Sequence, residues 1–278
     1  MMKNLIIQLK QNILKEISYV DGKFALAFLI LGEYGDHIYI NEKEAFHAAS
    51  TMKTPVMIEV FKQAQQGKFG LDDHLIIKNK FKSIVDSSPY SLSLSDDAGD
   101  ELYKFIGKYK SIHELIFEMI TVSSNLATNI LIDLVNPKNI METMQSIGAN
   151  DIQVIRGVED IEAYNKGLNN TTTALDLMII YKCIAEGILV SEEACNEMVK
   201  ILSAQKLNTK IPAKLPVNIK IAHKTGSLSG VEHDSGIIYL PDGRKYILVM
   251  LTKELKNMQK GIEAEANISK LIYDYMIK

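Results

Sequence analysis

Ile219-Lys220-Ile221-Ala222-His223-Lys224-Thr225-Gly226-Ser227 has the pattern of a strand that ends in a lysine, a small hydroxyl and a glycine. The lysine and the hydroxyl can bind a carboxylate, and the glycine lets an extended ligand lie alongside the backbone. A lysine on an edge strand can equally serve to protect that edge from aggregation. The choice between these two interpretations depends on the rest of the chain.

The elements around this strand predict one sheet made from both ends of the chain. A helical pattern covers residues 1–19, and a turn is expected at Glu33-Tyr34-Gly35 between the first two strands. A second turn, Pro241-Asp242-Gly243, joins the last two strands as a hairpin, and residues 258–277 form a final helix. The strand patterns cover residues 23–31, 37–40, 217–222, 236–240 and 246–252.

The middle of the chain, from Ser50 to about Gln205, is mostly helical in pattern. We therefore predict an α/β plus α fold of two lobes. Residues 1–45 and 206–278 form an antiparallel sheet flanked by helices, residues 46–205 form a central all-helical lobe, and the active site lies in the cleft between them. The polar residues 86–100 are interpreted as a surface excursion with no assigned chemistry.

Ser50-Thr51-Met52-Lys53 is the second informative motif. A helix that begins at Ser50 points free backbone N–H groups at the serine and places Lys53 one turn above it on the same face. Taken alone, the segment is explained as well by a helix cap at Ser50 and a solvated charge at Lys53.

Ser123-Ser124-Asn125 is the third motif and interrupts an apolar stretch between Ile120 and Ile130. Burying these polar groups unpaired would cost about 1–3 kcal/mol each, so they must face a wet cleft or one another. A helix cap at Ser123 or Ser124 is the alternative. Together the three motifs supply a nucleophile, an activating lysine, a proton-shuttling hydroxyl and a cationic anchor, which serine acyl transfer without a histidine requires.

Composition excludes several other classes of protein. The chain has 278 residues, 47% hydrophobic and 23% charged, with a net charge of −3, so nothing indicates binding to nucleic acid or to an anionic membrane. The longest apolar run, residues 24–31, is too short to span a bilayer. Cys183 and Cys195 could form one bridge or stay free. Because residues 1–19 do not resemble a secretion signal, the protein is expected to be cytoplasmic, or periplasmic or secreted after loss of a leader.

The three motifs resemble those of the penicillin-recognising serine hydrolases, and most closely the class A β-lactamases. The resemblance extends over essentially the whole length. It includes Asn170-Thr171-Thr172-Thr173-Ala174, which is similar to the end of the family's omega loop, and the strand at Gly236-Ile237-Ile238. It implies a serine β-lactamase that opens the β-lactam amide through an acyl-enzyme, with no cofactor and no metal, acting as a monomer on a small-molecule β-lactam.

The resemblance also implies roles for particular residues. Ser50 would be the acylated nucleophile, Lys53 would help to deprotonate it, and Ser123 would pass the proton to the departing nitrogen. For Lys53 to act as a base, burial and a neighbouring positive charge must lower its pKa, and Lys224 is the expected source of that charge. The implied substrate-binding residues are Asn125, Lys224, Thr225 and Ser227, the last through its backbone N–H in an oxyanion hole shared with Ser50.

The omega loop departs from the family's pattern. Arg156-Gly157-Val158-Glu159-Asp160-Ile161-Glu162 has one residue more between the arginine and the first glutamate than the family has. Glu159 is our choice for the base that activates water, and Glu162 is the second choice. Asn170 replaces the usual acidic partner of Arg156, so the arginine needs another partner or the loop is held differently.

Further departures lie elsewhere. Ser124 stands where class A enzymes usually carry aspartate, and no arginine lies between Ser229 and Ser235 to grip the carboxylate. His233-Asp234 occupies that stretch, as substrate contacts or as a hairpin-stabilising pair. His47 and His223, which lie beside motif residues, are interpreted as structural. The alternatives to a β-lactamase are a serine DD-peptidase or esterase of the same superfamily, a penicillin-binding sensor domain that acylates without turnover, and a pseudo-enzyme scaffold.

Overall fold

The computed structural model describes residues 2–32 and 35–278, and its centre is a five-stranded antiparallel sheet. The strand order is β2-β1-β11-β10-β9, so strands from the two ends of the chain lie side by side, as predicted. Glu33 and Tyr34, at the predicted first turn, lie outside the described residues. The strands are β1 (Lys23–Ile30), β2 (His37–Ile40), β9 (Lys220–Leu228), β10 (Val231–Tyr239) and β11 (Lys245–Lys253).

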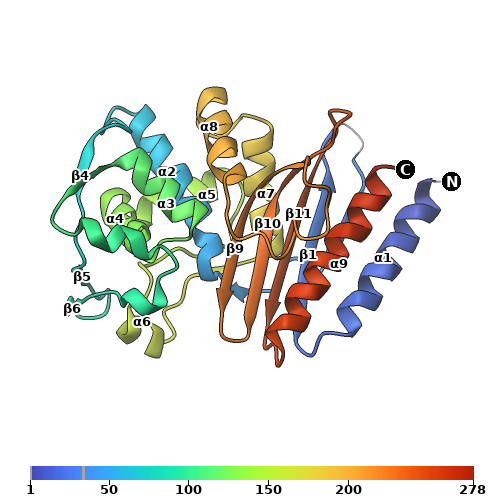
Figure 1. Ribbon diagram of the computed structural model, residues 1–278, viewed down its shortest axis with the longest axis horizontal. Coiled ribbons are helices and arrows are strands. Elements are labelled where there is room, and N and C mark those ends of the chain that lie inside the picture. The colour runs from blue at the N-terminus through green and yellow to red at the C-terminus, as the bar shows by residue number, and fades with distance from the viewer. Residues whose placement is uncertain (1, 33–34) are drawn as a thin grey trace.

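Both faces of this sheet are covered. The terminal helices α1 (Met2–Ser18) and α9 (Met258–Met276) pack side by side on one face (Figure 1). Along β1, Phe24, Leu26 and Phe28 point into the core under these two helices, whereas Ala25 and Ala27 point into the larger core on the other side. Because both faces are buried, β1 has a nearly continuous apolar sequence instead of an alternating one.

The other face of the sheet meets the helices of the central segment. Two of these, α7 (Ala174–Ala185) and α8 (Glu192–Ser203), fall inside the predicted helical lobe but pack directly on the strands. Their cysteines, Cys183 and Cys195, are free thiols. The remaining helices are α2 (Lys53–Gln65), α3 (Ile112–Thr121), α4 (Asn125–Val135), α5 (Pro137–Ser146) and α6 (Ile161–Asn165).

Local sequence explains where several of these helices begin. Ser111 and Glu114 form a reciprocal capping box at the start of α3. Asn136 caps α5, whose first residue is Pro137, where a missing N–H costs least. None of the helices in the described residues combines the length and apolarity needed to cross a bilayer.

Short strand pairs and 3-10 turns complete the central segment, and the sequence pattern did not predict them. The strands are β3 (Phe46–His47) with β8 (Thr171–Thr172), β4 (His74–Ile76) with β7 (Tyr109–Ser111), and β5 (Phe81–Lys82) with β6 (Pro89–Tyr90). The 3-10 turns are η1 (Ala49–Met52), η2 (Leu94–Asp96) and η3 (Asp100–Phe105).

The predicted strands 217–222 and 236–240 were misplaced. Strand β9 begins only at Lys220 and runs on through the Lys-Thr-Gly motif to Leu228, and β10 begins already at Val231. Gly230, with a φ of +76°, allows the tight turn between them, so the two strands pair along their whole length. Buried polar residues along both strands hide the apolar pattern by which strands are recognised.

Gly236 generates a prediction about stability. A Cβ at this position of β10 would lie 2.5 Å from the carbonyl oxygen of Ala222 and 2.6 Å from the Cβ of His223, both on the neighbouring strand β9. We expect Gly236→Ala to lower the free energy of unfolding by about 1–3 kcal/mol, because β9 must move away from β10. Urea unfolding would measure this change.

Gly70→Ala is the matched control for that experiment. A Cβ at Gly70 would meet its nearest neighbour, Asp73 Oδ1, at 3.5 Å, which is an ordinary contact. Its effect on the free energy of unfolding should stay within about 0.5 kcal/mol. Equal effects of the two substitutions would contradict the tight packing between β9 and β10.

Candidate active site

Ser50 lies in the 3-10 turn η1, and the α-helix α2 begins only at Lys53, so the predicted helix start at Ser50 is displaced by one turn. Ala49, the first residue of this turn, has a left-handed φ of +45°. The turn is closed by Thr51, whose N–H and hydroxyl both donate to the Ala48 carbonyl, at 3.0 and 2.6 Å. Ser50 is thereby held at the surface of a cavity.

Lys53, the first residue of α2, is completely buried. Its Nζ donates to the carbonyl and the hydroxyl oxygens of Ser123, at 2.6 and 3.1 Å, and to Oδ1 of Asn125 at 2.9 Å. Three acceptors match the three donors of an ammonium group. Lys53 is therefore not a solvated helix charge, and it joins the first two motifs.

Lys224 brings the third motif to the same hydroxyl. It lies on the edge strand β9 with its side chain fully buried, and its Nζ donates to Ser123 Oγ at 3.0 Å and to the Thr225 carbonyl at 2.9 Å. Burial excludes the interpretation of Lys224 as a solvated charge that protects the edge. Ser123 itself has a left-handed φ of +61°, so the contacts on either side of it hold a strained backbone.

Burial lowers the pKa of Lys53 to about 7, and the carboxylates of Asp97 and Glu159 partly oppose this effect. The sequence analysis expected burial and the charge of Lys224 to lower this pKa, and of the two, burial is the cause that lowers it. The pKa of Lys224 is also held well below its usual range, first by burial and then by the neighbouring charge of Lys53. Near neutral pH a substantial fraction of Lys53 carries a lone pair.

Gly226 lets the strand and the nucleophile turn approach each other. A Cβ at this position would lie 3.2 Å from the Cβ of Ala49, from the backbone nitrogen of Ser50 and from Cγ2 of Thr51. Any larger residue would push β9 away from the turn η1. The glycine of the third motif is thus required by close backbone approach.

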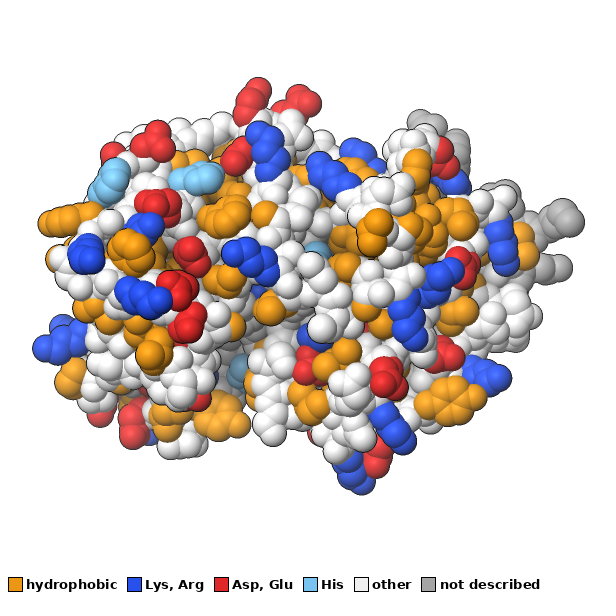
Figure 2. All heavy atoms as spheres, viewed as in Figure 1, with side chains coloured by type: hydrophobic (Ala, Val, Ile, Leu, Met, Phe, Trp, Pro, Cys, Tyr) orange, Lys and Arg blue, Asp and Glu red, His pale blue; other side chains and the backbone are white. Residues whose placement is uncertain are grey.

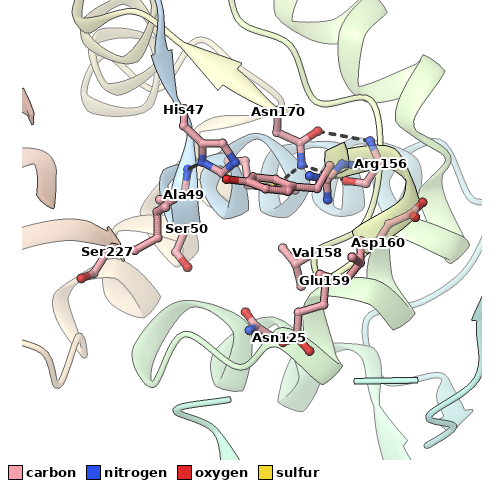
Figure 3. Close-up of a pocket in the computed structure, with 14 residues that line it drawn as sticks. His47, Ala49, Ser50, Asn125, Arg156, Val158, Glu159, Asp160, Asn170 and Ser227 are labelled. Carbon is pink, nitrogen blue, oxygen red and sulfur yellow. Dashed lines mark hydrogen bonds between the residues drawn. The ribbon is translucent and has the colours of Figure 1, made fainter. Parts of the chain in front are cut away.

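Two adjoining cavities contain most of the predicted site residues, and Ser50, Asn125 and Ser227 line both. The larger, of about 250 Å³, extends towards the omega loop (Figure 3), and the smaller, of about 160 Å³, is lined also by Ser123 and Thr225. In the space-filling view the surface is hollowed between the helical part and the sheet (Figure 2). The eight predicted residues are brought together: Ser50, Lys53, Ser123, Asn125, Glu159, Lys224, Thr225 and Ser227.

Asn125, the first residue of α4, connects Lys53 to Glu159. Its Oδ1 accepts from Lys53, and its Nδ2 donates to Glu159 Oε1 at 2.8 Å. The second oxygen of Glu159 accepts the backbone N–H of Ser93 at 3.1 Å. Glu159 has a left-handed φ of +60° and lines the larger cavity together with Ser50, whereas Glu162 is exposed on α6 and does not line it. The geometry favours Glu159 over Glu162 as a group near the nucleophile.

Asp97 is the residue of the site that the sequence analysis missed, because residues 86–100 were assigned no chemistry. Its buried carboxylate accepts the backbone N–H groups of Asn125 and Leu126, at 2.9 and 2.8 Å, at the start of α4. The predicted cap Ser124 is also present and accepts the N–H of Ala127. A carboxylate is thus present near position 124, although Ser124 replaces the family's aspartate. The one sequence signal for Asp97 was the start of α4, where free backbone N–H groups need hydrogen-bond acceptors.

Arg156 is held by neutral groups. Its guanidinium donates to the carbonyl oxygens of Leu168 and Gly157 and to Oδ1 of Asn169, at 2.7, 2.9 and 3.0 Å. Asn170 instead binds the backbone of the loop, since its Oδ1 accepts the N–H groups of residues 155 and 156 and its Nδ2 donates to the carbonyl of residue 156. The loop is held differently, as one of the two sequence-based alternatives proposed.

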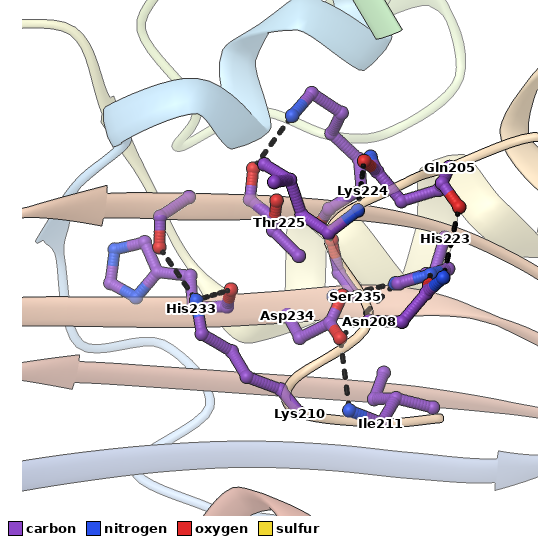
Figure 4. Close-up of polar contacts among 12 residues, drawn as sticks. Gln205, Asn208, Lys210, Ile211, His223, Lys224, Thr225, His233, Asp234 and Ser235 are labelled. Carbon is purple, nitrogen blue, oxygen red and sulfur yellow. Dashed lines mark hydrogen bonds and ion pairs between the residues drawn. The ribbon is translucent and has the colours of Figure 1, made fainter. Parts of the chain in front are cut away.

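Polar side chains on β9 and β10 form a buried network with residues of the segment before β9 (Figure 4). Contrary to the prediction of a hairpin-stabilising pair, His233 and Asp234 form hydrogen bonds with other residues. Neither of them lines the two cavities, so the structure does not place them as substrate contacts either. His233 donates from Nε2 to the His47 carbonyl at 2.8 Å, and Asp234 contacts Nδ1 of His223 at 2.9 Å. Successive residues of a strand face opposite sides, which separates the two partners.

Ser227, which lines both cavities, contacts a buried ion pair. The hydroxyl of Ser227 donates to Glu232 Oε1 at 2.8 Å, and Glu232 forms a buried ion pair with Lys210. Arg244 pairs with Asp242 on the exposed surface of the last hairpin. Within the described residues, no group of three or more His, Cys, Asp or Glu side chains is arranged to hold a metal ion.

The chain is similar in sequence and in structure to known β-lactamases and to a protein named PBP-A. The chain is 25% identical over 252 residues to the extended-spectrum β-lactamase PER-1 of Pseudomonas aeruginosa, covering 87% of this chain and 79% of that protein. A β-lactamase from Sphaerobacter thermophilus superposes with a TM-score of 0.82 at 25% identity, covering 97% of each chain. The structure of a protein named PBP-A gives a TM-score of 0.81 at 26% identity, covering 97% of this chain and 96% of that one.

The model of the β-lactamase enzyme family matches residues 8–276. Because this match covers nearly the whole chain, the protein belongs to the β-lactamase enzyme family. The two-lobe fold expected from the pattern of strands and helices is shared with these structural relatives.

The position of Asp97 generates a prediction about Lys53. The carboxylate of Asp97 raises the pKa of Lys53, so Asp97→Asn should lower that pKa further below about 7. Titration of the Lys53 side chain by NMR, with isotope-labelled lysine, measures the shift without reference to activity. Asp72→Asn, at an exposed position, is the control and should leave the titration unchanged. A pKa of Lys53 that stays constant or rises in Asp97→Asn would contradict the prediction.

Proposed function

We propose that this protein hydrolyses β-lactam antibiotics through an acyl-enzyme on Ser50. The observation that carries the proposal is the convergence of two buried lysines, from α2 and β9, on the hydroxyl of Ser123 beside the cavity that Ser50 lines. A histidine-free serine hydrolase needs this combination of a serine, a lysine of lowered pKa and a proton-shuttling hydroxyl. The names of its relatives, PER-1 among them, support β-lactams as the substrate.

Acylation begins with transfer of the Ser50 hydroxyl proton to the lone pair of a neutral Lys53. The serine oxygen then forms a bond to the β-lactam carbonyl carbon, and the negative charge on the carbonyl oxygen is stabilised by the backbone N–H groups of Ser50 and Ser227. Collapse of this intermediate breaks the bond between the carbonyl carbon and the ring nitrogen. Burial is what leaves Lys53 partly unprotonated at neutral pH.

The departing ring nitrogen takes its proton from Ser123. A hydroxyl has one donor and two lone pairs, so Ser123 Oγ can accept from both lysines and still donate into the cavity. The proton that Ser123 gives up is replaced from Lys53, which received one from Ser50. Lys224 and Thr225 bind the substrate carboxylate, and Asn125 binds the side-chain amide of the substrate.

Deacylation requires a base for water, and we assign this role to Glu159. Its carboxylate lines the same cavity as Ser50 and is oriented by Asn125 and by the backbone N–H of Ser93. Water gives a proton to Glu159, and its oxygen forms a bond to the ester carbon. The bond between this carbon and Ser50 Oγ then breaks, the product leaves as an acid, and Glu159 returns the proton to Ser50 Oγ. The presence of Glu159 in this cavity favours turnover over a sensor domain that stays acylated, and over a pseudo-enzyme scaffold.

The first test replaces the nucleophile. Ser50→Ala should abolish both the hydrolysis of a chromogenic cephalosporin and the mass increase that penicillin produces in the intact protein, because no oxygen remains to form the ester. Ser203→Ala, at the end of α8, is the control and should behave as the wild type. Persistent labelling of Ser50→Ala would move the nucleophile elsewhere, and absence of any adduct on the wild type would leave a scaffold.

The second test concerns Glu159. Glu159→Gln should slow the hydrolysis of the ester about 100-fold or more while acylation continues, so a one-to-one adduct should accumulate. Intact-mass measurement after mixing with penicillin detects the adduct. Glu162→Gln is the matched control and should turn over normally, because Glu162 is exposed outside the cavity. Unchanged turnover in Glu159→Gln would refute the assignment, and a stable adduct on the wild type would identify a sensor.

A further inference from the structure

The residue before the proposed nucleophile has a strained backbone. Ala49 has a φ of +45°, a conformation that costs a residue with a Cβ about 1 kcal/mol or more and persists only where surrounding contacts hold it. Its backbone N–H donates to Nδ1 of His47 at 3.0 Å. Figure 3 shows the His47 ring beside the Ala49 backbone, with Ser50 next to it along the cavity.

His47 is itself fixed from two sides. Its carbonyl accepts from Nε2 of His233 at 2.8 Å, which ties it to β10. Its strand β3 pairs with β8, where Thr171 lies opposite His47, and the next residue, Ala48, donates to the Asn170 carbonyl at 2.8 Å. The backbone of residues 47 and 48 is therefore anchored to the sheet and to the end of the omega loop, and the imidazole connects this anchored segment to the nucleophile turn.

The hydrogen bond defines the protonation state of the ring. Because Nδ1 accepts a backbone N–H, it carries no proton, and the ring is neutral with its proton on Nε2. Burial, and then the charge of Arg156, lower the pKa of His47, so the neutral form is the one present at neutral pH. The other ionisable groups that line the cavity with His47 are Arg156, Glu159, Asp160 and Tyr164, and His233 approaches from β10.

We propose that His47 is a positioning residue, whose neutral imidazole holds the Ala49 peptide in its left-handed conformation and thereby fixes the hydroxyl and the N–H of Ser50. This assignment rests on the proposed role of Ser50 as nucleophile. Protonation of Nδ1 would set two N–H groups against each other, and the turn would lose this contact. The His47 ring is then required as an acceptor and not only as a side chain that fills space.

Two substitutions separate these roles. In His47→Asn, Oδ1 can accept the N–H two residues further on, as asparagine does in Asx turns, so acylation should stay within about threefold of the wild type. His47→Leu fills similar space without an acceptor, and its acylation rate should fall about tenfold or more, with little change in non-covalent binding of substrate. Stopped-flow acylation by a fluorescent penicillin gives the rate and the binding constant separately.

The pH profile adds a readout that a packing role would not change. As the pH falls below about 7, the wild type first takes up a proton on Lys53, and below the lowered pKa of His47 it takes up a second one on the imidazole. The slope of the logarithm of its acylation rate against pH should therefore steepen from about 1 to about 2. In His47→Asn only Lys53 takes up a proton as the pH falls, so the slope of the logarithm of the acylation rate should stay at about 1. Equal slopes in the two proteins, or a loss of acylation in His47→Asn as large as in His47→Leu, would overturn the proposal.

Nitrogen-15 NMR of the wild type tests the proposal independently of activity. At pH 7.5, which is about one unit above the usual pKa of histidine, Nδ1 of His47 should show the chemical shift of an unprotonated nitrogen. A proton on Nδ1 at that pH would overturn the proposal even if Ser50 is the nucleophile. Failure of the wild type to form any acyl-enzyme, with Nδ1 unprotonated, would instead refute the proposed function and with it the positioning role.

Discussion

Two buried lysine side chains share the hydroxyl of Ser123, and the remaining structure serves to make this contact possible. An ammonium group without a carboxylate partner is costly away from water, and a second one beside it raises the cost. The protein lowers that cost by surrounding each nitrogen with acceptors and by letting Lys53 lose its proton near neutral pH, and the pKa of Lys224 is likewise held well below its usual range. A reactive site results from groups that would be ordinary surface charges elsewhere.

Bringing these lysines together requires segments that are far apart in the sequence. Lys53 begins α2, Ser123 precedes α4, and Lys224 belongs to an edge strand formed by the end of the chain. The close approach depends on small residues at the contact, since the edge strand carries Gly226 at the position where it meets the turn at Ala49. Three residues with strained backbones, Ala49, Ser123 and Glu159, line the two adjoining cavities, as is common at sites built for chemistry.

Local rules were enough for the strands β1 and β11 and for most helices, because these two strands are strongly apolar and the helices have clear caps. Local rules misplaced β9 and β10, because the many buried polar residues of these strands give them the composition of a loop. Local rules also missed the short strand pairs, which are defined by tertiary contacts alone. The motif residues were predictable because each motif is local. Asp97 was not, because its role depends on a loop folding onto a helix that begins 28 residues later. The exact domain boundaries stay a prediction.

The omega loop is anchored by a cation on uncharged oxygens. An arginine that is paired with a carboxylate loses its partner when acid neutralises that group, and dissolved ions weaken an accessible pair of this kind. Carbonyl and amide oxygens do not titrate in the range where proteins stay folded. The hydrogen bonds by which Arg156 anchors this loop therefore do not depend on the protonation state of a carboxylate.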